Sequence, residues 1–118
     1  VKPTDFKADE VSIQAFSPGG ASLVPDADFI EASLATLAVG RGGVATFDAI
    51  ELGKKLAGKR AGVQFTIGNL NEQIAASGSP RDLETILQLI YLKATAPRRD
   101  EAAFNALRRS CRLFFWRL

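Results

Sequence analysis

The sequence contains no histidine and no methionine, and Cys111 is its single cysteine among 118 residues. The absence of histidine excludes a Ser-His-Asp triad, a Cys-His pair, an H-x-x-E-H zinc helix and any imidazole general base. One cysteine excludes an internal disulfide, a zinc ribbon and an iron–sulfur cluster held by this chain alone. The absence of methionine predicts a chain that is processed or that forms part of a longer polypeptide.

Long hydrophobic runs and a strong net charge are also absent. No stretch of 18 apolar residues occurs, so we expect no membrane contact, and residues 1–5 lack the charged-then-apolar pattern of a signal peptide. The formal charge of +2 is too small to predict a nucleic-acid partner. Residues 98–118 contain six arginines, and Asp100 and Glu101 are the only acidic residues among them. The arginines indicate a solvated helix face, with a basic binding patch as the alternative.

Three short segments carry the pattern of β-strands. Residues 11–16 alternate apolar and polar side chains, and the turn sequence of residues 17–20 ends them. Residues 63–67 form a second strand with Val, Phe and Ile on one face, and residues 72–77 form a third. Residues 69–71 join the last two as a hairpin, which favours antiparallel pairing.

One helix is predicted between the first two strands, over residues 28–39. Asp28 and Glu31 resemble a capping box at its start, and the alternative for these residues with Asp26 is a set of oxygen ligands for calcium. Its apolar face is predicted to consist of Ile30, Leu34, Leu37 and Ala38.

Three further helices have recognisable starts. One begins at Thr46 as N-cap and runs through Ala57. The clearest begins at the N-cap Ser79, followed by Pro80, and the last begins near Asp100. The apolar face predicted for the helix after Ser79 consists of Leu83, Ile86, Leu87, Ile90 and Tyr91. The apolar face predicted for the last helix consists of Phe104, Leu107, Cys111 and Phe114 or Phe115.

The order of elements is therefore strand, helix, helix, strand, strand, helix, helix. This order predicts one α+β domain over residues 1–118, a two-layer sandwich with a mainly antiparallel sheet and helices packed on one face. The apolar ending around Trp116 either packs on this sheet or forms an interface with a partner.

Four sequence motifs carry a resemblance that covers residues 1–108. They are Ser17-Pro18-Gly19-Gly20-x-Ser22-Leu23, Leu52-x-x-x-Leu56-Ala57-Gly58-Lys59, Ser79-Pro80-Arg81-Asp82-Leu83-Glu84 and Ala96-Pro97-Arg98-x-Asp100-Glu101-x-x-Phe104. In order and spacing they resemble one unit of the insulinase/pitrilysin family of zinc metallopeptidases. The resemblance implies related α+β units that close around a peptide in an internal chamber, with zinc held by an H-x-x-E-H helix of another unit.

The residue-by-residue comparison places the zinc helix on residues 28–39. Ala32, Ala35 and Thr36 then occupy the positions of the two histidines and the glutamate. The resemblance thus implies a non-catalytic unit of the C-terminal half, with no catalytic residue, no metal ligand and no cofactor of its own. Zinc is expected in the catalytic unit of the parent chain, a zinc-dependent metalloendopeptidase.

The family's peptide-pairing strand, with a signature similar to Asn-Ala-x-Thr, corresponds to residues 63–66, where only Thr66 matches. The resemblance implies Gln64, Phe65 and Thr66 as candidates for peptide contact, with a plain sheet strand as the alternative. The implied partners are other units of the same polypeptide and the peptide in the chamber, and the isolated domain is expected to self-associate. The alternative function is that of a catalytically dead scaffold of the same fold. Long-chain bacterial relatives favour the periplasm, with the cytoplasm as the alternative.

Overall fold

The computed structural model describes the backbone of residues 1–115 and the side chains of residues 1–111. The helices and strands are β1 (Val11–Pro18), α1 (Phe29–Gly42), α2 (Ala49–Lys55), β2 (Ala61–Ile67), β3 (Asn71–Gly78), α3 (Leu83–Thr95) and α4 (Glu101–Phe115). Single 3-10 turns occupy Gly20–Leu23 (η1), Asp26–Asp28 (η2) and Pro80–Asp82 (η3). The predicted order of elements is confirmed, and the predicted roles of Phe114, Phe115 and Trp116 lie outside the described side chains.

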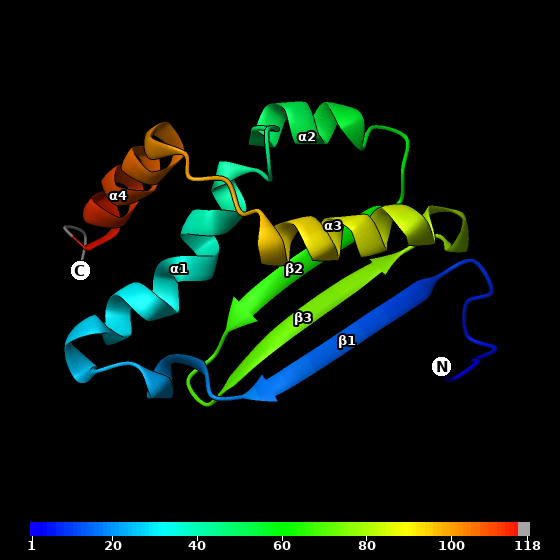
Figure 1. Ribbon diagram of the computed structural model, residues 1–118, viewed down its shortest axis with the longest axis horizontal. Coiled ribbons are helices and arrows are strands. Elements are labelled where there is room, and N and C mark those ends of the chain that lie inside the picture. The colour runs from blue at the N-terminus through cyan, green and yellow to red at the C-terminus, as the bar shows by residue number, and fades with distance from the viewer. Residues whose placement is uncertain (116–118) are drawn as a thin grey trace.

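The three strands form one antiparallel sheet in the order β1-β3-β2 (Figure 1). Gly68 donates its N–H to the carbonyl of Asn71 over 2.8 Å and so closes the β2–β3 hairpin. The sheet is antiparallel throughout, and the chain is an α+β sandwich as the sequence predicts.

The two faces of the sheet differ in polarity because side chains alternate along each strand. The register brings Ile13, Ala76 and Val63 side by side on the inner face, and α3 lies over β2 and β3 there (Figure 1). The outer face consists of exposed residues, namely Ser12, Gln14, Phe16, Gly62, Gln64, Thr66, Gln73, Ala75 and Ser77. Among the described residues, the helices therefore cover one face of the sheet only.

The start of α3 is the element that sequence reasoning locates best. Ser79 accepts a hydrogen bond from the N–H of Arg81, and Pro80 occupies the first helical turn. Asp82 also accepts a hydrogen bond from the N–H of Arg60 over 2.9 Å, which ties this helix start to the beginning of β2. The helix is thereby fixed above the sheet at its first turn.

The predicted inward face of α3 is wrong in part. Ile86 is fully buried, but Leu87 is 53% exposed and Tyr91 67% exposed, while Leu89 is buried in their place. Lys93 continues the inward stripe seven residues after Ile86, as helical periodicity requires. The helix is rich in apolar residues on several sides, so periodicity alone did not distinguish the face that meets the sheet.

The apolar face predicted for α1 is likewise not its core face. Ile30 is 66% exposed and Leu37 45% exposed, and no capping bond is made by the side chain of Asp28. The chain enters α1 through the 3-10 turn η2, so Asp28 lacks the extended backbone that an N-cap needs. The more closely packed side of α1 carries small residues instead.

The N-cap of α2 is Asp48 rather than Thr46. The Asp48 carboxylate accepts from the N–H groups of Ile50 and Glu51, and Glu51 accepts from the N–H of Asp48 in return, which completes a capping box. The carbonyl of Thr46 accepts instead from Arg98 Nη1 over 2.9 Å.

A compact junction holds the end of α1 against the segment that follows α3. Val44 is buried and forms isolated bridges with Phe47 and Pro97. Gly43 has a φ of 87°, where a Cβ would collide with the carbonyl oxygen of Phe47, so glycine is needed to end α1 there. The junction fixes the position of α1 beside β2.

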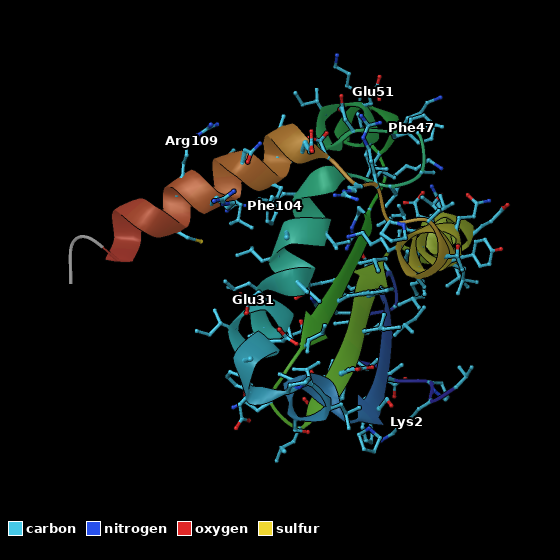
Figure 2. The ribbon with its side chains drawn as sticks, turned by 60° about the vertical axis from the view of Figure 1, so that its left-hand side comes forward. Lys2, Glu31, Phe47, Glu51, Phe104 and Arg109 are labelled. Atoms are coloured by element: carbon cyan, nitrogen blue, oxygen red, sulfur yellow. The ribbon has the colours of Figure 1, made fainter. Side chains whose placement is uncertain are left out.

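The last helix, α4, contacts α1 and extends away from the sheet (Figure 2). Leu107 is buried and Cys111 is half-buried, as predicted. Phe104 was also predicted to face the core, but it is 48% exposed, so that prediction is wrong. In the part of the chain that the structure describes, no helix combines the length and the apolar character needed to cross a bilayer.

Candidate groove at the free edge of strand β2

The strand β2 has β3 as its single neighbour among the described residues, so its other edge is free. Two hydrogen bonds fix which backbone groups point to that edge. Ser79 donates to the carbonyl of Arg60 over 2.9 Å, and Gly68 donates to Asn71. Bonded and non-bonded pairs alternate along an antiparallel ladder. The even-numbered residues of β2 therefore bond to β3, and the odd-numbered ones direct N–H and C=O outwards.

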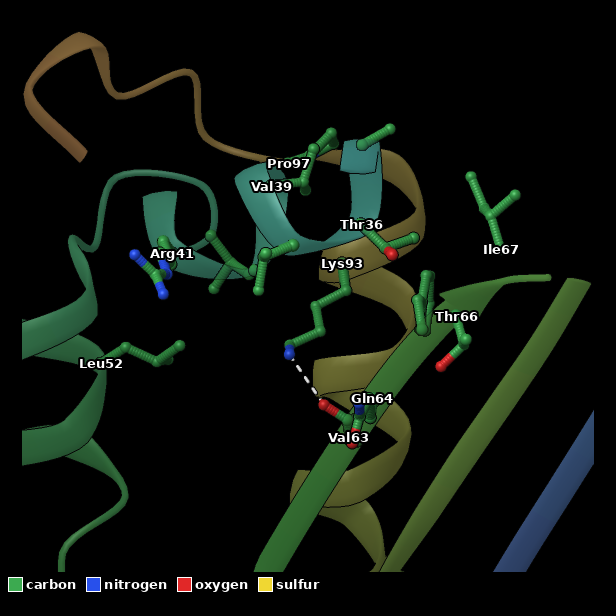
Figure 3. Close-up of a pocket in the computed structure, with 16 residues that line it drawn as sticks. Thr36, Val39, Arg41, Leu52, Val63, Gln64, Thr66, Ile67, Lys93 and Pro97 are labelled. Carbon is green, nitrogen blue, oxygen red and sulfur yellow. Dashed lines mark hydrogen bonds between the residues drawn. The ribbon is translucent and has the colours of Figure 1, made fainter. Parts of the chain in front are cut away.

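Within the groove, the outward groups belong to Val63, Phe65 and Ile67. The carbonyl of Val63 accepts a hydrogen bond from Lys93 Nζ over 2.7 Å, a contact that reaches from α3 to the edge of β2 (Figure 3). It confirms independently that odd-numbered carbonyls face away from β3. The N–H and C=O groups of Phe65 and Ile67 remain free for another extended chain.

A groove of about 660 Å³ runs between this edge and α1. It is lined by Ala35, Thr36, Leu37, Val39, Gly40, Arg41, Gly43, Val44, Leu52, Val63, Gln64, Phe65, Thr66, Ile67, Lys93 and Pro97. Figure 3 shows Thr36 and Val39 on the α1 side and Val63, Gln64 and Thr66 on the β2 side. The lining is mostly apolar, with backbone groups along one wall, which suits an extended peptide better than a compact polar ligand.

The side of α1 that borders the groove carries Ala35 and Thr36, two of the three positions assigned to the zinc helix. Neither side chain supplies an imidazole, thiolate or carboxylate, the donors that zinc requires. Within the described part of the chain, no three acidic, cysteine or histidine residues come together as a metal site. The donors present in the groove do not fit a catalytic zinc ion.

The ionisable side chains among the groove residues are Arg41 and Lys93, and both are cations. In the described residues neither takes part in an ion pair. Burial lowers the pKa of Lys93 below its ordinary value, because the ammonium loses water without gaining an anion. The groove therefore holds uncompensated positive charge.

The three residues predicted to contact peptide all line this groove, but in different ways. Phe65 presents its backbone to the free edge and its half-buried ring to the inner face. Gln64 and Thr66 have exposed side chains on the outer face, and the alternation commits their backbone groups to β3. Backbone recognition here would thus involve Phe65 directly, while Gln64 and Thr66 flank it.

Sequence reasoning missed Lys93 and Arg41 as groove residues. A signal existed for Lys93, since it lies seven residues after Ile86 on the stripe that faces the sheet. A lysine on such a stripe either extends its ammonium to water or finds a backbone acceptor. No comparable signal existed for Arg41, because its place depends on how the junction at Val44 positions the last turn of α1.

No protein-family model matches the chain, and no protein of curated function resembles it closely enough in sequence to be matched. Among solved structures, the periplasmic protease PqqL from Escherichia coli contains a similar fold, with a TM-score of 0.80 and 20% sequence identity. The similarity covers 90% of this chain and 12% of PqqL. The chain thus spans about an eighth of the protease it resembles. It has the fold of one part of a periplasmic protease.

Proposed function

We propose that this chain is a non-catalytic domain of an insulinase/pitrilysin-type zinc metallopeptidase, where it forms part of the wall that encloses a peptide. The observation that carries the proposal is the free edge of β2, which faces α1 across a groove without zinc-binding side chains. The shared fold with part of a periplasmic protease supports it. Proteolysis would then depend on zinc held by another unit of the same polypeptide.

The domain would hold peptide by strand addition to β2. An extended segment in the groove would exchange backbone hydrogen bonds with Phe65 and Ile67, whose outward groups have no partner in the described structure. Backbone pairing of this kind accepts many sequences, because the side chains of the added strand do not take part in it. This property suits a chamber that must retain varied peptides.

Hydrogen exchange measured by NMR tests the strand addition directly. In the free domain, the amides of Phe65 and Ile67 should exchange quickly, while those of Gln64 and Thr66 should be protected by β3. Saturating peptide should slow exchange at Phe65 and Ile67.

The amides at the free edge of β1 are the internal control, and saturating peptide should leave their exchange unchanged. Unchanged exchange at Phe65 and Ile67 in the presence of saturating peptide would remove the peptide-binding role.

Catalysis by this chain alone is not expected, because no residue in the groove can activate a zinc-bound water. The test is a peptide-cleavage assay of the purified chain with added zinc, with and without the zinc-bearing unit of the parent protein supplied in trans. Cleavage should need that unit. Zinc-dependent turnover by the chain on its own, after contaminating proteases are excluded, would contradict the proposal.

The alternative function is that of a scaffold that has lost catalysis throughout. The rest of the polypeptide distinguishes the two functions. A peptidase needs an H-x-x-E-H helix there, whereas a catalytically dead scaffold lacks one. The periplasm is the compartment we propose, because the protease that shares this fold is periplasmic.

A further inference from the structure

The two cations of the groove both lie towards one of its ends. Lys93 reaches the carbonyl of Val63, the groove residue nearest the beginning of β2. Arg41 lies in the last turn of α1, next to the buried junction around Val44. Figure 3 shows Arg41 and Lys93 on the same side of the groove as Leu52 and away from Ile67. The opposite end, towards Ile67, has no ionisable lining residue.

Among the groove residues, the row of unoccupied backbone groups also ends at Val63. The carbonyl of Val63 is occupied by Lys93, whereas the carbonyls of Phe65 and Ile67 are free. A lysine ammonium carries three donors, so Lys93 keeps donors for a ligand after bonding Val63. Its depressed pKa reflects burial without a compensating anion, and a bound carboxylate would supply one.

The direction of β2 decides which end of a peptide meets these cations. The neighbour β3 is antiparallel, and antiparallel ladders are the more stable kind. A peptide that pairs antiparallel with β2 runs from Ile67 towards Val63. Its last residue therefore arrives beside Lys93, and Arg41 offsets the negative end of the α1 dipole there.

We propose that the groove recognises the free C-terminal carboxylate of an extended peptide that pairs antiparallel with β2 and places this carboxylate on Lys93. This inference rests on the proposed peptide-binding function. It adds that the groove binds the peptide by its C-terminal end. Such a site would hold peptides by their C-terminus inside the enclosure, whatever the sequence that precedes it.

The test uses an N-terminally fluorescein-labelled heptapeptide of alternating valine and serine, made with a free C-terminal carboxylate or a C-terminal amide. Fluorescence anisotropy should show the acid binding about tenfold more tightly than the amide, as expected for one charge-assisted hydrogen bond. Lys93→Gln should bring the two peptides to within about twofold. Lys54→Gln, the same charge change on the exposed side of α2, should preserve the difference.

The outcomes separate this inference from the proposed function. If acid and amide bind equally to the wild-type domain, the carboxylate site is overturned and peptide binding stands. If neither binds, the proposed function fails first. A third peptide carries a C-terminal amide and an internal glutamate. If it binds as tightly as the peptide with the free C-terminal carboxylate, the groove recognises any carboxylate and the proposed recognition of the chain end is overturned. Arg41→Gln should weaken the preference in part, which keeps the test decisive if Lys93→Gln does not fold.

Discussion

The two edges of the sheet are built from strands of similar length, yet their surroundings differ. The edge of β2 is bordered by α1, lies under α3 and has one carbonyl bonded by Lys93. The edge of β1 has no helix packed along it among the described elements, and Phe16 on that strand is 80% exposed. Both edges present unpaired backbone groups, and those of β2 lie inside a groove.

The difference shows what makes a sheet edge selective. An edge that no helix borders is a site where a second copy of the same protein can pair. At β2 a helix borders the edge and Lys93 adds a charge, and we propose that these two features restrict which chains pair there. We therefore propose peptide recognition at β2 and expect self-association at β1.

The largest expected effect tests how α3 packs on β2. Ile86→Ala should lower the free energy of unfolding by about 2–5 kcal/mol, because a fully buried side chain on α3 is truncated above the sheet. Leu87→Ala is the adjacent control and should cost under about 1 kcal/mol, since this residue is largely exposed. Urea denaturation measures both, and similar losses would show that α3 faces the sheet differently.

The next test exploits two glutamines that flank the same residue. Gln14 on β1 and Gln64 on β2 both lie opposite Ala75, but the alternation directs only the N–H of Gln64 into the sheet. Gln64→Pro should cost roughly 2–4 kcal/mol in unfolding free energy by removing a ladder bond. Gln14→Pro should cost under about 1 kcal/mol, because its N–H faces the free edge. Equal costs in thermal or urea unfolding would refute the assigned edge.

A smaller effect concerns association between copies. Phe16 and Thr66 both face Gln73 across the outer face, one on each edge strand. Phe16→Lys should reduce concentration-dependent self-association in sedimentation velocity, because it places a charge on the unprotected edge. Thr66→Lys is the matched control and should change it less. A stronger effect of Thr66→Lys would assign self-association to β2 instead.

The smallest effect is a pH dependence from Lys93. Its pKa is lower in the folded chain than in the unfolded one, so the unfolded chain binds more protons between the two values. Stability should therefore rise with pH in the window below the ordinary lysine pKa and level off above it. Lys93→Gln should flatten this rise relative to Lys54→Gln in urea titrations at several pH values. An unchanged slope would indicate that Lys93 is hydrated.

Local signals predicted the elements well because each signal acts within a few residues. The cap formed by Ser79 and Pro80, the hairpin before Asn71 and the alternation in β2 were all readable and are confirmed. The faces of α1 and α3 were not, because both helices carry apolar residues on more than one side. Which side is buried depends on the partner, and no local pattern specifies the partner.

The sequence by itself determined that no imidazole chemistry belongs to this chain, since no fold can supply a missing side chain. It also determined the order of strands and helices through turns and caps. Tertiary structure alone decided that β2 lies at an edge, that α1 borders it and that Lys93 is half-buried at the end of the groove. These features depend on strand order and helix docking, which are set by contacts between residues far apart in the chain, such as Lys93 with Val63.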